Sequence, residues 1–304
     1  MTTYTNGYGL PAAYVNAVVA GDRTPKPRTI SVTELVKPVQ VRTLEVAHAH
    51  ELVSDVADRL PAAFGTAFHE YLARHAGPSS FAEQTLSVEV DGWTVHGTPD
   101  AVDWLAFDDE DGTLIDWKTT LYRSLKAERW EWEAQLNCYA HLIRLAGLPP
   151  VQSLVIWAYL RDWDGALRAS DPLYPSLGIV RKDVMLWEPA LADRYLRWRL
   201  AAHRAAQEDG VVPECTDAER WVRYTYALVK EGNGRATRVF DTQAEAQQYA
   251  EAVTEHPRDW RDWYVVEERK GQPIRCLSWC AARPWCGQAA RELDGDEQLL
   301  LVAQ

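Results

Sequence analysis

The segment LIDWKTT, residues 114–120, ends an apolar run with an acid and a lysine two positions apart. Side chains at alternate positions of a β-strand point to the same face of the sheet. We therefore expect Asp116 and Lys118 to share one face, with Trp117 turned the other way into the core. Taken alone, such a pair most often lies on a solvent-exposed strand edge without a function. The neighbouring segments therefore determine whether a functional role is indicated.

Two strands are predicted immediately before this segment. QTLSVEV (84–90) and WTVHGTPDAVDWLAF (93–107) alternate apolar and polar residues on either side of Asp91-Gly92, a dipeptide that favours a tight hairpin turn. A second turn at 108–112 leads into the strand that carries Asp116. Asp100 lies on the neighbouring strand, and adjacent antiparallel strands bring two carboxylates within reach of one cation.

Hydrophobic spacing predicts an α/β arrangement for most of the chain. Helices are expected over 58–76, 128–147 and 190–207, and further strands over 151–160 and 178–187. After residue 211 the pattern changes to a hairpin, a helix and a strand, which together predict a ββαβ unit. The expected organisation is a partly ordered arm (1–30), an α/β core (31–210), a cysteine-containing region (211–290, with the ββαβ unit at about 224–270) and a tail (291–304).

The residue types of the predicted strands suit phosphodiester cleavage. Magnesium and manganese ions prefer hard oxygen ligands and keep positions open for water. A bound ion activates one such water, and a lysine orients the water or offsets the charge that develops on the phosphate. Asp100 and Asp116, with Lys118 beside them, therefore predict a metal-dependent nuclease centre.

Two more motifs accompany these strands. GTAFH (65–69) places His69 on a helix before the first acid, and QLNCY (135–139) places Gln135 and Tyr139 one helical turn apart after the lysine. The order His, Asp, Asp-x-Lys, Gln-x-x-x-Tyr resembles the RecB-like branch of the PD-(D/E)XK nuclease superfamily. The resemblance implies the restriction-endonuclease-like core of that superfamily, a central mixed sheet flanked by helices.

This resemblance covers roughly residues 30–210 and implies roles for individual residues. Metal binding is implied for four groups: His69, Asp100, Asp116 and the backbone carbonyl of Trp117. Lys118 is implied to be catalytic, and Gln135 and Tyr139 to support the site or the DNA strand. Considered one at a time, His69 would more often be a surface or core histidine, and Tyr139 a core residue.

Contacts with DNA are expected from polar residues outside the metal centre. Ser31 and Thr33 match a Ser-x-Thr start that is often seen upstream in such nucleases. Basic residues near the catalytic lysine and around the second hairpin are candidate phosphate contacts, with a solvated loop as the alternative in each case: Arg123, Lys126 and Arg129 in the first group, and Lys230, Arg235 and Arg238 in the second.

Three of the five cysteines are concentrated in CLSWCAARPWC, residues 276–286. Cys276, Cys280 and Cys286, with Cys215 as a fourth ligand, predict a zinc or iron-sulfur site, and their spacing alone does not choose between the two. A set of unligated thiols is the alternative. Cys138, inside a predicted helix, is expected to be a small core residue.

The resemblance favours a four-iron cluster for these cysteines. RecB-like nucleases of the AddB type and the CRISPR-associated exonucleases end with a comparable three-cysteine group that binds such a cluster with one distant cysteine. In those relatives the distant cysteine usually precedes the nuclease core, whereas Cys215 follows it and the ββαβ unit is inserted before the other three. This departure leaves zinc as the alternative metal.

Charge and hydropathy limit the classes of function. The net charge of −12 argues against a protein that coats nucleic acid through bulk electrostatics, although a local basic groove remains compatible with it. No window approaches the roughly 18 apolar residues of a membrane span, and the start lacks the layout of a signal peptide. We therefore expect no membrane association and a location in a bacterial or phage-infected cytoplasm.

The function predicted from these patterns is a divalent-metal-dependent DNA exonuclease acting in recombination, repair or phage DNA processing. The sequence has no G-x-x-x-x-G-K phosphate loop, so we expect any helicase or recombinase partner to be a separate chain. A structure-specific DNA endonuclease is the second enzymatic interpretation. A non-cleaving protein that binds DNA ends on the same fold is the alternative from another class.

Overall fold

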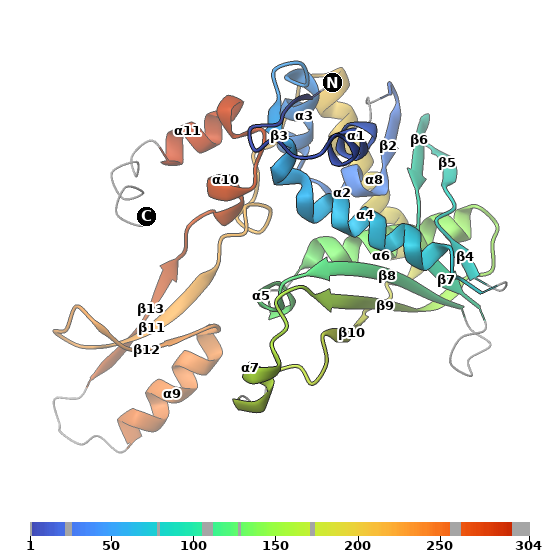
Figure 1. Ribbon diagram of the computed structural model, residues 1–304. Helices are drawn as coiled ribbons and strands as arrows, with labels where there is room; N and C mark the ends of the chain where they lie inside the picture. The colour runs from blue at the N-terminus through green and yellow to red at the C-terminus, as the bar shows by residue number, and fades with distance from the viewer. Residues whose placement is uncertain are drawn as a thin grey trace. The chain divides into compact units, whose positions relative to one another are not determined.

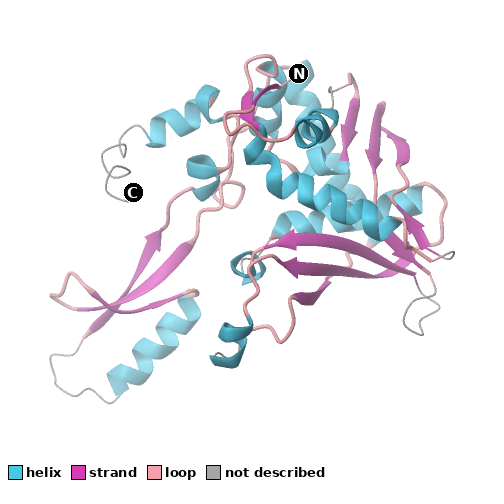
Figure 2. Cartoon of the chain, in the orientation of Figure 1, coloured by secondary structure: helices cyan, strands magenta, loops and turns pink. Residues whose placement is uncertain are grey.

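The computed structural model describes residues 2–21, 26–77, 80–104, 112–126, 129–170, 174–255 and 263–293. The chain divides into two compact units, Met1–Val212 and Pro213–Gln304. Each unit has its own sheets and helices, which Figure 1 and Figure 2 show, and the two units are described separately below.

The first unit contains a mixed five-stranded sheet in the order β10-β9-β8-β7-β4. Its strands are β4 (Ser80–Ala82), β7 (Ala101–Asp103), β8 (Gly112–Thr120), β9 (Val151–Leu160) and β10 (Ile179–Val184). β8 and β9 run parallel, and the other neighbouring strands are antiparallel. The near-continuous apolar run of β9 suits a strand covered on both faces, and Leu154 and Ile156 on it are almost fully buried.

A second sheet of the first unit has the order β2-β6-β5, with β2 (Thr29–Ser31), β5 (Leu86–Val90) and β6 (Trp93–Gly97). The turn between β5 and β6 is Asp91-Gly92, and both residues have positive φ as a tight hairpin turn requires. The prediction of one strand over 93–107 was wrong, because β6 and β7 are separate strands in different sheets; residues 105–107 lie outside the described residues. Pro99 stands at the break, where its missing N–H and the restriction it places on Thr98 end the strand.

Helices cover these sheets, and a short parallel pair of strands, β1 (Thr3–Thr5) and β3 (Val53–Asp55), lies beside them. The helices are α1 (Ala12–Ala20), α2 (Val32–Val36), α3 (Val39–Ala47), α4 (Leu60–Ala73, after a 3-10 turn at Val56–Arg59), α5 (Tyr122–Lys126), α6 (Trp130–Leu145), α7 (Gly165–Ser170) and α8 (Pro189–Glu208). α1 and β1 therefore fall within the stretch predicted as an N-terminal arm.

α4 and α6 both pack on β8, and Figure 1 shows α4 running along that strand. Phe68 of α4 meets Tyr159 of β9 edge-on, with ring centroids 4.3 Å apart, and Trp117 lies 6.3 Å from the same ring. α6 instead supplies Tyr139, whose hydroxyl lies within electrostatic reach of Asp116. Since Asp116 and Trp117 point to opposite faces of β8, the two helices cover opposite sides of the strand.

The position of the short helix α2 is fixed by two buried side chains of α8. Arg199 donates from Nε to the Leu35 carbonyl at 3.0 Å, and His203 donates from Nε2 to the same carbonyl at 3.0 Å. The two residues are only 4% and 1% exposed. They satisfy a carbonyl at the end of α2 that has no partner within the helix, and this holds Ser31 and Thr33 at the start of α2 in place.

The second unit contains an antiparallel sheet in the order β12-β11-β13, with β11 (Tyr224–Lys230), β12 (Ala236–Phe240) and β13 (Tyr264–Lys270). α9 (Gln243–Glu255) comes between β12 and β13 and packs on this sheet. α10 (Ile274–Ser278), a 3-10 turn at Arg283–Trp285 and α11 (Gly287–Leu293) complete the described part. The tail beyond residue 293 lies outside the described residues.

Candidate metal-dependent active site

Asp100 stands where β6 and β7 separate, one residue before the ladder between β7 and β8 begins. Its side chain is 12% exposed and turns to the backbone of β8, where the Trp117 N–H donates to Oδ2 at 2.7 Å. A buried carboxylate needs such a donor. The hydrogen bond ties Asp100 to the strand that carries Asp116 and Lys118.

Asp116 and Lys118 lie side by side on one face of β8. The ammonium Nζ of Lys118 is 2.9 Å from Oδ1 and 2.7 Å from Oδ2 of Asp116, which is 2% exposed. Oδ2 is buried and makes no well-aligned hydrogen bond, so one acceptor of the carboxylate depends on the charge of Lys118 alone.

The protonation behaviour of this pair reflects its burial. Burial raises the pKa of Asp116 to about 6, against the opposing effect of the Lys118 charge. Burial also acts to lower the pKa of Lys118, but the negative charges of Asp116 and Asp100 outweigh it, so that pKa lies above its ordinary value. Lys118 is therefore a fixed positive charge beside Asp116, whose ionised form is disfavoured by burial.

His69 reaches this centre from α4. Its Nε2 lies 2.8 Å from the Trp117 carbonyl, and its Nδ1 lies 3.3 Å from Oδ1 of Asp100. Burial acts to lower the pKa of His69, but the hydrogen bond and charge of Asp100 raise it above the ordinary value. The histidine and the first acid are thus in contact, at the junction of α4, β7 and β8.

Gln135 and Tyr139 lie one turn apart on α6 and contact each other. Gln135 Nε2 donates to the Tyr139 hydroxyl at 3.1 Å, and the Thr33 side chain also hydrogen-bonds that hydroxyl. Burial raises the pKa of Tyr139. Thr33, Gln135 and Tyr139 therefore form a polar group beside Asp116 and Lys118, and Thr33 belongs to it because α8 fixes α2.

Tyr139 is seated against Gly97, the last residue of β6. A Cβ built at Gly97 would lie 2.6 Å from Cε1 of the Tyr139 ring, closer than real Cβ atoms come to any heavy atom. The glycine of GTPD thus lets the ring approach the strand. The sequence shows Gly97 only as part of the GTPD motif and does not reveal its contact with Tyr139.

We expect Gly97→Ala to displace Tyr139, to lower the free energy of unfolding of the first unit by about 1–3 kcal/mol, and to reduce the DNA cleavage predicted from the sequence. Denaturant unfolding and a DNA-cleavage assay measure the two effects. Gly165→Ala is the matched control, because a Cβ there would lie no closer than 3.8 Å to its nearest neighbour, Trp163. Equal stability of the two variants would contradict the contact.

Glu83 is a site residue that the sequence analysis missed. Among the described residues, the group of histidine, cysteine or acidic side chains whose ligand atoms all lie within 4.8 Å of one another consists of His69, Glu83 and Asp100. Asp116 is outside this group and is paired with Lys118. Glu83 follows the three-residue strand β4, and only the register of β4 with β7, which pairs Ala82 with Ala101, brings it beside Asp100.

The predicted DNA contacts are placed as follows. Ser31 caps α2, where its side chain accepts from the Glu34 N–H in a capping box. The Lys126 side chain lies outside the described residues. Arg238, in the second unit, stacks over the rings of Phe240 and Tyr249 at 5.1 and 4.8 Å, Arg235 is exposed in the β11–β12 loop, and Lys230 ends β11.

Four cysteines, Cys215, Cys276, Cys280 and Cys286, all lie in the second unit, and none of them forms a disulfide. Burial raises the pKa of the Cys215 thiol to about 12, and Glu219 and the other three thiols, as anions, add to the effect. The four thiols therefore lie within electrostatic reach of one another. Cys138 lies elsewhere, 1% exposed in the core of the first unit.

The backbone of Cys215 is held by one side chain of α11. Gln288, which is 5% exposed, accepts from the Cys215 N–H at 3.0 Å and donates to the Cys215 carbonyl at 2.9 Å. Close by, the Ala289 N–H points at the sulfur of Cys286 at 3.4 Å. Gln288 thus joins the segment of Cys215 to the segment of Cys286 without a metal.

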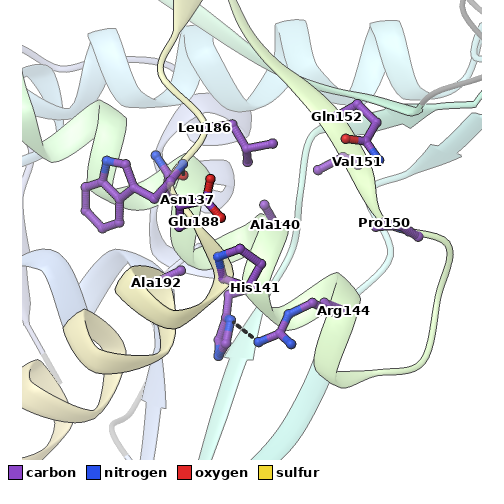
Figure 3. Close-up of a pocket in the computed structure, with 12 residues that line it drawn as sticks. Asn137, Ala140, His141, Arg144, Pro150, Val151, Gln152, Leu186, Glu188 and Ala192 are labelled. Atoms are coloured by element: carbon purple, nitrogen blue, oxygen red, sulfur yellow. Dashed lines mark hydrogen bonds between the residues drawn. The ribbon is translucent and has the colours of Figure 1, made fainter.

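A cavity of about 260 Å³ lies between α6, α8 and the start of β9 (Figure 3). His141 is among the residues that line it; its Nε2 is 3.2 Å from Asp193, and its Nδ1 accepts from Arg144 at 3.0 Å. Val151 at this cavity and Ile156 beside Asp116 are five residues apart on β9, roughly 16 Å along the strand. The cavity is therefore separate from the acidic centre, and its histidine already has partners on both ring nitrogens.

The fold is a mixed α/β core, and the site combines acids and a lysine on adjacent strands with a histidine from a covering helix. Together they define the class of protein to which the chain belongs. A sequence profile of the PD-(D/E)XK nuclease superfamily matches residues 13–287, and the chain belongs to this superfamily. Its members are typically nucleases, which bind DNA and usually use divalent metals such as Mg²⁺.

Other comparisons add little to this assignment. No curated protein matches the chain. One of the solved structures that the fold matches is "Crystal structure of SSO0001", with a TM-score of 0.43 and 15% sequence identity over 62% of this chain and 83% of that one. Among the described residues, no helix is both long and apolar enough to cross a bilayer.

Proposed function

We propose that the protein is a divalent-metal-dependent DNA exonuclease of the RecB-like branch, acting in recombination, repair or phage DNA processing. One observation carries the proposal. Nδ1 of His69 lies 3.3 Å from Oδ1 of Asp100, next to the strand β8 on which Asp116 and Lys118 form an ion pair. Acids, a histidine and a lysine at one strand junction suit hydrolysis of a phosphodiester, which needs both a hard cation and a fixed positive charge.

The residues fit a divalent cation on the chemistry of their donor atoms. The carboxylates of Asp100 and Asp116 and the His69 ring supply oxygen and nitrogen ligands, and the buried Oδ2 of Asp116 lacks an aligned hydrogen-bond donor. The Trp117 carbonyl accepts from Nε2 of His69 and so fixes the orientation of the ring. When bound, Mg²⁺ or Mn²⁺ supplies Lewis acidity and a water of lowered pKa. The alternative, a DNA-end-binding protein without activity, would not need these ligands beside a lysine that is half-buried and paired with an acid.

Lys118 and the α6 residues have separate roles in this proposal. Lys118 is the catalytic cation: its Nζ orients the attacking water or offsets the charge that grows on the scissile phosphate. Tyr139, held by Gln135 and Thr33, places a hydroxyl donor next to this centre, where it positions Lys118 or the DNA strand. The buried pair with Asp116 keeps Lys118 in place before DNA arrives.

Digestion of end-labelled linear DNA and of closed circular DNA, with and without Mn²⁺, tests the proposal. An exonuclease releases label from linear DNA and spares covalently closed circles, and cleavage disappears with chelator. Cutting of the circles would favour a structure-specific endonuclease. Binding of DNA ends without cleavage at any metal concentration would favour the non-cleaving alternative.

We propose further that Cys215, Cys276, Cys280 and Cys286 hold one structural metal centre, a four-iron cluster, with zinc as the alternative. Support for one shared centre comes from the four thiols lying within electrostatic reach of one another in the second unit. The choice of iron-sulfur over zinc rests on the resemblance to AddB-type and CRISPR-associated nucleases, because cysteine ligands alone suit both metals.

The ββαβ unit of the second unit is proposed as a DNA-guiding attachment, and three basic residues test it. Replacing Lys230, Arg235 and Arg238 together with glutamine should weaken DNA binding by at least about tenfold at low salt. The slope of log K against log salt should fall by roughly 2, because fewer counterions are released. Fluorescence anisotropy over a salt series measures both.

The control for this triple variant removes the same charge elsewhere. Arg181, Arg194 and Arg204 are exposed residues of the first unit, on β10 and α8. Replacing these three with glutamine should leave the salt slope nearly unchanged. If both triple variants lost the same DNA affinity, the change in net charge would explain the loss, and the guiding role would be rejected.

A further inference from the structure

Glu83, Asp100 and His69 bring three hydrogen-bond acceptors together. The Glu83 Oε1 lies 3.7 Å from Nδ1 of His69, and the Asp100 Oδ1 lies 3.3 Å from the same nitrogen. All three ligand atoms are within 4.8 Å of one another. Carboxylate oxygens only accept hydrogen bonds, so what this cluster needs is a positive charge at its centre.

The hydrogen bond between Nε2 of His69 and the Trp117 carbonyl determines the tautomer of the ring, and so whether Nδ1 can act as an acceptor toward Glu83 and Asp100. A carbonyl oxygen cannot donate, so Nε2 of His69 carries the proton that bonds the Trp117 carbonyl at 2.8 Å. In the neutral ring Nδ1 then holds the lone pair, and it points at both carboxylates. A histidine whose far nitrogen donates to a backbone carbonyl is the arrangement expected of a metal ligand.

Local charge also favours a cation at this point. Glu70 follows His69 on α4, and its charge reaches Glu83 together with that of Asp100. Lys118, the lysine of β8, is closest to Asp116, at 2.7 Å, and its single charge is shared with Asp100. The acids around His69 therefore lack a full counter-charge from their described neighbours, and a proton on Nδ1 would supply only one unit.

The backbone of Glu83 is held in an unusual conformation that keeps its side chain here. Its φ is +49°, in the left-handed region that residues other than glycine rarely adopt. Its N–H donates to the Asp100 carbonyl at 3.3 Å, and its side chain is 35% exposed. A residue kept at a strained φ while pointing a carboxylate at two potential ligands is a mark of function rather than of packing.

We propose that Glu83, the residue that follows the edge strand β4, is a ligand of the divalent cation at His69 and Asp100. Nδ1 of His69 and the carboxylates of Glu83 and Asp100 would hold the ion, which suits the oxygen and nitrogen ligands that such cations accept. This inference rests on the proposed nuclease function for its biological meaning, but it concerns metal binding alone.

Titration of the metal-free full-length protein with Mn²⁺, in the absence of DNA, tests the assignment by calorimetry or electron paramagnetic resonance. Glu83→Gln should raise the Kd for Mn²⁺ by about tenfold or more, as loss of a ligand does. Glu70→Gln is the matched control, since it removes one negative charge next to His69 from an exposed side chain outside the cluster. It should change the Kd by less than about threefold, a small electrostatic effect.

Glu83→Gly separates ligation from folding. Glycine adopts positive φ without strain, so the metal-free variant should have a melting temperature no lower than that of the wild type. The increase in melting temperature that Mn²⁺ gives the wild type should be largely lost. This pattern is not expected if Glu83 serves only the structure.

Three outcomes would overturn the inference: no Mn²⁺ binding by the wild type, an unchanged Kd in Glu83→Gln, or equal losses in Glu83→Gln and Glu70→Gln. The proposed function fails separately. If Mn²⁺ affinity depends on Glu83 but the wild type cleaves no DNA, the metal site stands and the nuclease assignment does not. If DNA is cleaved while Glu83→Gln binds Mn²⁺ normally, the reverse holds.

Discussion

Lys118→Met is expected to abolish DNA cleavage, lowering its rate by at least about a thousandfold, because it removes the fixed positive charge from the scissile phosphate. It is also expected to destabilise the first unit. The Asp116 carboxylate would remain buried without its counter-charge, and breaking a buried ion pair from one side costs about 3–5 kcal/mol. Protonation of Asp116 limits this cost, because burial already raises its pKa to about 6.

The double variant Asp116→Asn/Lys118→Met separates the two effects. It removes both charges, so its free energy of unfolding should lie closer to the wild type than that of Lys118→Met, while cleavage stays absent. Urea denaturation and single-turnover cleavage measure these quantities. Lys26→Met, at an exposed position, is the control and should change neither. Cleavage at the wild-type rate by Lys118→Met would reject the active-site assignment, and wild-type stability would reject the buried pair.

Cys286→Ser is expected to remove the metal centre of the second unit and to loosen that unit as a whole. Ligation between Cys215 and the three later cysteines closes a loop of about sixty residues, and binding free energy at such sites is folding free energy. Anaerobically purified wild type should be brown and contain iron and sulfide. The variant should lose most of both, and limited proteolysis should cut it faster beyond residue 212.

Cys138→Ala is the matched control for this prediction. Cys138 is buried in the core of the first unit, whereas the other four cysteines belong to the second, so its removal should cost some stability in the first unit and leave the iron content unchanged. Colourless wild-type protein with one zinc would change the metal but keep the centre. Four titratable thiols and no metal would reject both.

Most of the polar residues proposed for the site lie in local patterns that the sequence shows directly. The spacing of Asp116 and Lys118 on an apolar strand gives their common face, and one helical turn separates Gln135 from Tyr139. The long strand over 151–160 and the helix around Gln135 are predicted for the same reason, since their periodicity is continuous.

The remaining features depend on contacts that local pattern does not carry. Glu83 follows a strand of only three residues, and its place beside Asp100 comes from sheet register. Pro99 splits an alternating run between two sheets, which alternation alone does not reveal. The burial of Asp116 beside Lys118 depends on the helices that pack on β8, and the local pattern of the strand does not reveal it.

The contacts of Arg199 and His203 with the end of α2 set an order of events during synthesis. These side chains lie more than 160 residues after Leu35, whose carbonyl they bind. Until the ribosome has released the chain beyond residue 203, α2 has no anchor and Thr33 has no defined position beside Tyr139. A partly made chain therefore carries every acid of the metal centre and yet has an unfinished catalytic pocket. The ability to cleave DNA should therefore appear late in folding, once α8 has packed on α2. Contacts between residues so far apart in the sequence form slowly.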